Sequence, residues 1–127
     1  MDNLSIESTK YTPEIKMSVE TGIISLTGKS YPENTFEFYQ PVMDWLEEYF
    51  NGNAQDKTVI NIEIIYFNSS SSKLFFDLFD ILDAAKDEHN IEINWIYDEE
   101  NESAEEAGED FKEDFEDLNI QLVGKTS

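Results

Sequence analysis

Four consecutive serines, Ser69 to Ser72, are the side chains in this sequence best placed to do chemistry. They follow the apolar residues 58–67 and precede a helical pattern, so a predicted strand delivers them to a helix N-terminus. One serine would serve as the N-cap, with its neighbours as turn residues. Alternatively, a phosphate on one hydroxyl would lie beside free backbone N–H groups and the positive helix end, as a reversible switch requires. Position alone favours these two interpretations equally.

A serine hydrolase is a remote alternative. A serine nucleophile needs a nearby general base, and the single histidine, His89, is predicted at the far end of the helix that the serines begin. At 1.5 Å per helical residue the separation is roughly 20 Å or more. His89 is therefore interpreted as a cation near a helix C-terminus, and Ser69 or Ser70 has no evident base.

Residues 98–117 hold twelve carboxylates and one lysine, Lys112. Their order does not match a calcium-binding loop. The carboxylates fall mostly off the apolar stripe of Ala104, Phe111 and Phe115, as on a solvated helix face. Cysteine is absent, and so are the glycine-rich loops that hold nucleotides. We therefore expect no metal and no cofactor.

Acidic residues outnumber basic ones by 29 to 8, and the formal charge is −21. Such a surface repels phosphate backbones and anionic lipids, so neither nucleic acid nor membrane is an expected partner. The charge serves either solubility or recognition of a partner with a basic face. The first residues lack the pattern of a signal peptide, and no apolar run approaches membrane-spanning length. We expect a cytoplasmic protein.

The elements that position the serines form one α/β domain over residues 1–127. Apolar and polar residues alternate up to residue 19, and a turn at 20–22 and a strand at 23–28 follow. This pattern predicts an N-terminal β-hairpin. Helices are predicted from an Asn34 cap to residue 50, from the serines to about residue 90, and along residues 104–118, alternating with strands at 58–67, 91–97 and 120–123. This alternation predicts a mixed or parallel sheet with right-handed crossovers, in which both faces of the central strand are covered. Pro41 should kink the first helix or start its main segment.

Several stretches spanning nearly the whole chain resemble the SiaC family of bacterial regulatory phosphoproteins, whose fold is like that of STAS-domain anti-sigma factor antagonists. They are Ser8-Thr9 through Thr12-Pro13-Glu14, the run Ser30 to Asn34, the block Ile65 to Lys73, and Asn94-Trp95 through Tyr97 with Asn101-Glu102, Glu105-Glu106, Gly108-Glu109 and Phe111. The resemblance implies a STAS-like fold and a protein that is not an enzyme. A cognate serine/threonine kinase would phosphorylate it and a PP2C-like phosphatase would reverse the modification. The unmodified form would bind and activate a diguanylate cyclase, and so control cyclic di-GMP signalling and biofilm formation.

The resemblance also implies which hydroxyl is modified. The acceptor of the family directly follows the asparagine of the strand-to-helix turn, which here makes Ser69 the first candidate and Ser70 its rival. The expected partner-binding residues surround it on the turn and the first helical turns: Asn68, Ser70, Ser71, Lys73, Phe76 and Asp77. An anti-sigma factor antagonist in a partner-switching circuit would share the fold and the phosphorylated turn, and it remains an alternative function.

Overall fold

The computed structural model describes residues 1–126. The elements in chain order are β1 Leu4–Ile6, β2 Glu14–Met17, β3 Ile23–Ser30, α1 Thr35–Phe50, β4 Lys57–Phe67, α2 Ser69–Ala85, β5 Asn90–Asp98, α3 Glu102–Asp114 and β6 Ile120–Lys125. The strands form one six-stranded sheet in the order β1-β2-β3-β4-β5-β6. β1, β2 and β3 pair antiparallel, whereas β3, β4, β5 and β6 pair parallel. The predicted N-terminal hairpin and mixed sheet are confirmed.

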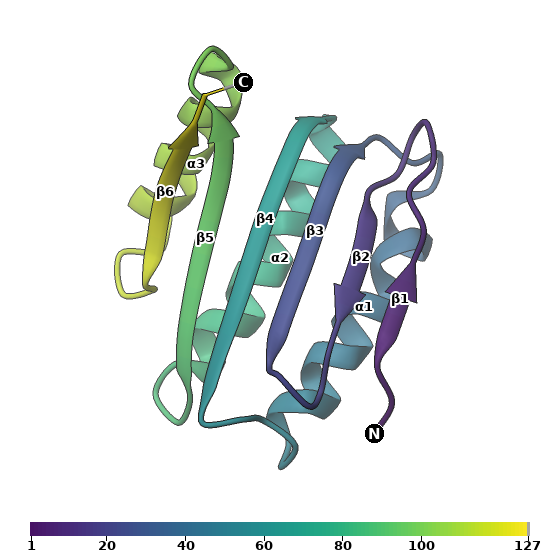
Figure 1. Ribbon diagram of the computed structural model, residues 1–127, viewed down its shortest axis with the longest axis vertical. Coiled ribbons are helices and arrows are strands. Elements are labelled where there is room, and N and C mark those ends of the chain that lie inside the picture. The colour runs from purple at the N-terminus through teal and green to yellow at the C-terminus, as the bar shows by residue number, and fades with distance from the viewer. Residues whose placement is uncertain (127) are drawn as a thin grey trace.

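The three helices lie against the same face of the sheet (Figure 1). Each one connects neighbouring parallel strands, and each step moves in the same direction across the sheet. Crossovers of one hand then place every helix on one side. The core lies between these helices and the sheet, and its largest fully buried side chains include Trp95, Tyr39, Tyr49, Phe75 and Phe79.

The prediction that the central strand is covered on both faces is wrong. Alternate residues of β4 from Thr58 to Ile64 are buried against the helices, but Asn61 and Glu63 between them are only half-buried. Across this open face, Asn94 Nδ2 of β5 donates to Asn61 Oδ1 at 2.9 Å. A run of β-branched residues fits a strand with one open face as well as a strand with none, so composition did not separate the two cases.

β4 contains a bulge shortly before it reaches the serines. Gly28 of β3 pairs with Ile64, but the next residue, Lys29, pairs with Tyr66, so Ile65 is an extra residue in β4. Ile65 and Tyr66 are both exposed as a result, and Phe67 turns inward, where its ring contacts Phe75. Bulges commonly re-aim side chains beside functional sites. β3 accordingly continues to Ser30, two residues beyond its predicted end.

The helix boundaries refine the prediction. Asn34 caps α1 as expected, because its side chain accepts the backbone N–H of Glu37 at 3.0 Å. Pro41 lies inside α1, six residues after its start, so the alternative that Pro41 begins the main segment is wrong. α2 ends at Ala85, short of the predicted end near residue 90. Among residues 1–126, no helix is both long and apolar enough to cross a membrane.

Candidate functional site

The serines form the first turn of α2 and do not cap it. The N-cap is Asn68, whose extended backbone leaves β4 and whose Oδ1 accepts the backbone N–H of Ser71 at 2.9 Å. The interpretation of one serine as the N-cap is therefore wrong. An asparagine oxygen performs this role as well as a serine oxygen does, and the cap came one residue earlier than expected.

Burial separates the four hydroxyls. Ser69 and Ser70 are exposed, Ser72 is half-buried, and Ser71 has no exposed surface. An enzyme that modifies the folded protein must reach its acceptor, so Ser69 and Ser70 are the accessible hydroxyls of the run.

Ser71 belongs to a buried hydrogen-bond network that joins α2 to β3 and α1. The Tyr39 hydroxyl lies 2.5 Å from Ser30 Oγ, which donates to Ser71 Oγ at 2.8 Å. Ser71 Oγ in turn donates to the Ser30 carbonyl at 2.9 Å, and the Asn68 N–H donates to the same carbonyl at 3.1 Å. Burial raises the pKa of Tyr39 to about 12, so its phenol keeps the proton that this network needs. The network therefore holds the strand-to-helix turn at Asn68 against β3 and α1.

Sequence reasoning missed Ser30 and Tyr39 as members of the site. Ser30 lies in a stretch that carried the family resemblance, which was the available signal, but nothing in the spacing linked it to Ser71. The network also gives Ser71 a structural role. Because its side chain is fully buried, we leave Ser71 out of the partner-binding surface.

The charge at the start of α2 differs from that of the other helices. α1 carries Glu37 in its first turn and α3 carries Glu102 and Glu105, whereas the first turn of α2 has no acidic residue. Negative charge in this position stabilises the positive end of a helix. A phosphate on Ser69 would supply that missing charge, one turn away from the exposed Lys73.

The remaining predicted partner residues point to two sides of α2. Phe76 lines a groove between α2 and α3, where its ring lies 5.2 Å from that of Phe111. Asp77 lines a separate groove between α1 and α2, together with Gln40 and Met43. Phe76 and Asp77 therefore belong to different surfaces. Asn68 is half-buried and occupied by capping, which leaves Ser70 and Lys73 as the exposed polar residues beside Ser69.

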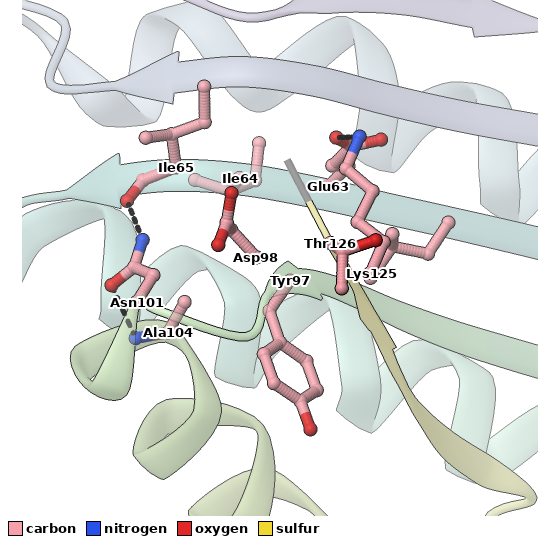
Figure 2. Close-up of a pocket in the computed structure, with 10 residues that line it drawn as sticks. Glu63, Ile64, Ile65, Tyr97, Asp98, Asn101, Ala104, Lys125 and Thr126 are labelled. Carbon is pink, nitrogen blue, oxygen red and sulfur yellow. Dashed lines mark hydrogen bonds and ion pairs between the residues drawn. The ribbon is translucent and has the colours of Figure 1, made fainter.

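A second feature lies at the edge of the sheet where β4 and β5 end: a cavity of about 330 Å³ between these two strands (Figure 2). The two strands pair only as far as Ile62 and Trp95, although both continue beyond this point. Asn101 bridges β4 and α3 beside this cavity, because its Nδ2 donates to the Ile65 carbonyl at 3.0 Å and its Oδ1 accepts the Ala104 N–H at 3.2 Å. One asparagine thus caps α3 and ties it to the strand that leads to Ser69.

The hydrolase alternative finds no support in the geometry. His89 follows the C-terminal end of α2, with its ring 5.0 Å from that of Phe50. α2 has 17 residues, which at 1.5 Å each place about 25 Å between Ser69 and the end of the helix that His89 follows. Within residues 1–126, no three or more histidine, aspartate or glutamate side chains are grouped to hold a metal ion.

Comparisons with known proteins agree on one family. The model of the SiaC family regulatory phosphoprotein matches residues 6–125. An uncharacterised protein of Pseudomonas aeruginosa (strain UCBPP-PA14) is 36% identical over 115 residues, which are 90% of either chain. The crystal structure of apo-SiaC from P. aeruginosa superposes with a TM-score of 0.85 at 31% identity, covering 99% of this chain and 100% of the other. A chain in the crystal structure of the diguanylate cyclase SiaD with its activator SiaC gives 0.89 at 32% identity, covering 96% and 99%.

Proposed function

Because the chain belongs to the SiaC family of regulatory phosphoproteins, we propose that it binds and activates a diguanylate cyclase until phosphorylation stops it. SiaC from P. aeruginosa is an activator of the cyclase SiaD, with which it forms a crystallised complex. Through such an enzyme this protein controls cyclic di-GMP and biofilm formation. It works by binding in the cytoplasm and has no catalytic activity of its own.

The observation that carries this proposal is the position of Ser69. Its hydroxyl is exposed on the first residue of α2, directly after the cap Asn68. Backbone N–H groups of the first turn have no partner within a helix, so a phosphate here meets donors and a positive helix end. Ser69 is the proposed acceptor. Ser70 is the second choice, because it is exposed one residue further along.

Phosphorylation changes the surface and leaves the fold in place. The turn is anchored through Asn68 and Ser71, neither of which uses the Ser69 hydroxyl. The phosphate adds about −1.5 to −2 charges to the surface at neutral pH. The proposed partner surface consists of Ser70, Lys73 and Phe76. Asn68 adjoins it as the helix cap, and Asp77 lies on the other side of α2.

Two enzymes set the state of the switch. A cognate serine/threonine kinase adds the phosphate, and a PP2C-like phosphatase removes it. Since Ser69 is already helical, both enzymes must recognise the folded turn or open it first.

Intact-mass spectrometry after incubation with the cognate kinase tests the acceptor. The wild type should gain one phosphate, and Ser69→Ala should gain none. Ser70→Ala is the matched control and should be labelled like the wild type. Unchanged labelling of Ser69→Ala would contradict the assignment.

A titration against the cyclase tests the direction of the switch. The unmodified chain should bind and raise the rate of cyclic di-GMP synthesis, and the phosphorylated chain should bind at least about tenfold more weakly. Equal affinity of the two forms, or no binding by the unmodified form, would overturn the proposed function.

A further inference from the structure

An exposed aromatic patch lies at the carboxyl edge of the sheet, on the face that carries no helix. We call it the open-face patch; it consists of Tyr11, Tyr31, Ile65 and Tyr66. The Tyr31 ring packs edge-on against both Tyr11 and Tyr66, with 5.4 Å between ring centroids in each pair. Tyr11, Ile65 and Tyr66 are each more than half exposed, at 57%, 58% and 56%. The bulge in β4 turns Ile65 and Tyr66 outward, four and three residues before Ser69.

Two lysines stand beside this patch. Lys10 and Lys29 line a cavity of about 380 Å³ together with Ile65, Thr9, Thr27 and Glu14. In the part of the chain that the structure describes, the ion pairs are formed by Lys57, Lys86 and Lys125, so neither lysine of the cavity is neutralised by one.

The side of the molecule that carries the helices is predominantly acidic. α1 carries four acidic residues, α2 three and α3 seven, against Lys73 and Lys112 alone. An anionic segment is repelled by that side at short range. The cavity with Lys10 and Lys29 is where such a segment can approach, and the adjoining patch offers it an apolar contact.

Whether phosphorylation strengthens or weakens binding distinguishes a cationic from an anionic partner segment. A phosphate on Ser69 adds negative charge at the end of the strand that carries the patch. It would strengthen the binding of a cationic segment and weaken that of an anionic one. Since the unmodified form is the one proposed to bind, an acidic effector segment near this edge would account for release by the phosphate.

We infer that the open-face patch, with Lys10 and Lys29, docks an acidic segment of the effector that carries an apolar or aromatic anchor residue. The anchor packs on Ile65 and Tyr66, and the carboxylates of the segment pair with the two lysines. Phosphorylation of Ser69 then acts by repelling this segment. The inference rests on the proposed function and names the part of the surface that reads the added charge.

Charge reversal of the two lysines tests the inference in a titration against the full-length cyclase. Lys10→Glu/Lys29→Glu should lower the affinity of the unmodified chain by about tenfold or more. The matched control is Lys57→Glu/Lys112→Glu, which makes the same change of net charge at two exposed lysines outside the patch, one at the opposite end of β4 and one on α3. The control should change the affinity by less than about twofold, because distant surface charges are screened. An unchanged affinity of the first variant, or equal losses in both, would overturn the inference.

The apolar contact has its own variant. Tyr66→Ala should weaken binding by about tenfold, as expected for an aromatic anchor site. Phe36→Ala removes a side chain that is 68% exposed on α1, and it should leave the affinity unchanged. Circular dichroism melts check that each variant is folded. If the two substitutions cost the same, the open-face patch is not the docking surface.

Salt separates repulsion from simple blocking. In about 0.5 M salt, where charges are screened beyond roughly 4 Å, the affinities of the phosphorylated and unmodified chains should converge. A phosphate effect that is independent of salt would overturn repulsion as the mechanism.

Two further results have distinct meanings. Failure of the unmodified wild type to bind the cyclase at all defeats the proposed function, whereas binding that the lysine variants leave intact defeats the inference alone. Sedimentation of the isolated chain tests a second copy as the occupant. Self-association that Lys10→Glu/Lys29→Glu abolishes would assign the patch to the acidic α3 of another copy and overturn the inference.

Discussion

The N-termini of α2 and α3 are built alike but charged differently. Each follows a parallel strand at the same edge of the sheet, and each is capped by an asparagine, Asn68 or Asn101, that accepts the N–H three residues on. The first turn of α3 contains Glu102 and Glu105, and that of α2 contains hydroxyls only. The negative charge of α3 is therefore permanent, whereas the proposed phosphorylation of Ser69 would give α2 a charge that can be removed. A switch at this position requires a first turn that is stable without its anion.

The anchors of the two helices explain how that stability arises. α2 is held by the buried hydroxyls of Ser71, Ser30 and Tyr39. α3 is held by Trp95, whose Nε1 donates to the Ala104 carbonyl at 2.9 Å, and by close packing at Gly108, where a Cβ would lie 2.5 Å from the Trp95 ring. Each first turn is thus tied to a strand independently of its charge, so substitutions can remove the anchoring contacts and the charge separately.

The largest effect is expected from a charge placed inside the α2 anchor. Ser71→Asp buries a carboxylate and breaks two hydrogen bonds, so it should cost about 3 kcal/mol or more of unfolding free energy. Ser70→Asp places the same group in solvent and should change stability by less than about 1 kcal/mol. Urea denaturation measures both variants. Similar stabilities would show that Ser71 is not buried in solution.

The next effect concerns the Tyr39 hydroxyl and pH. Burial raises the folded pKa from 10.0 to about 12, so the unfolded chain loses this proton first. The stability that the buried Tyr39 phenol contributes is complete below pH 10 and is lost as the pH rises through 12. The wild type should therefore lose about 2 to 3 kcal/mol more than Tyr39→Phe over this range. Parallel pH dependence of the two proteins in denaturation experiments would contradict the network.

Removing the caps compares the two helices directly. Asn68→Ala and Asn101→Ala should each cost about 1 kcal/mol of stability through the lost cap. Asn101→Ala should cost about 0.5 to 1 kcal/mol more, because its Nδ2 also donates to the Ile65 carbonyl. Equal losses in denaturant titrations would show that this second bond contributes nothing.

The smallest effect is the exchange of charge between the two first turns. Ser69→Asp should stabilise the protein by about 0.3 to 1 kcal/mol, and Glu102→Gln should destabilise it by a similar amount. Both changes should shrink in high salt. Thermal melts at two salt concentrations provide the measurement, and a destabilised Ser69→Asp would contradict stabilisation of the α2 N-terminus by negative charge.

The sequence predicted the elements well because their apolar residues are strongly periodic. The hairpin, the helix after Asn34 and the strand at residues 58–67 were each found within a few residues. It did not predict the open face of the sheet, because the side on which a crossover helix packs leaves little trace in a β-branched strand. The bulge at Ile65 was missed for a related reason, since an inserted residue is visible only against the register of the neighbouring strand.

The serine run shows where the two kinds of information divide. The sequence by itself determined the net charge, the position of the hydroxyls between a strand and a helix, and the asparagine before them. The tertiary structure decided which hydroxyls are accessible, because Ser71 is removed from solvent by Ser30, a residue 41 positions away that reaches it only when β3 pairs with β4. It also brought Tyr11, Tyr31 and Tyr66 together beside the turn. Local patterns specify elements, but burial and juxtaposition depend on contacts between residues that are distant in the chain.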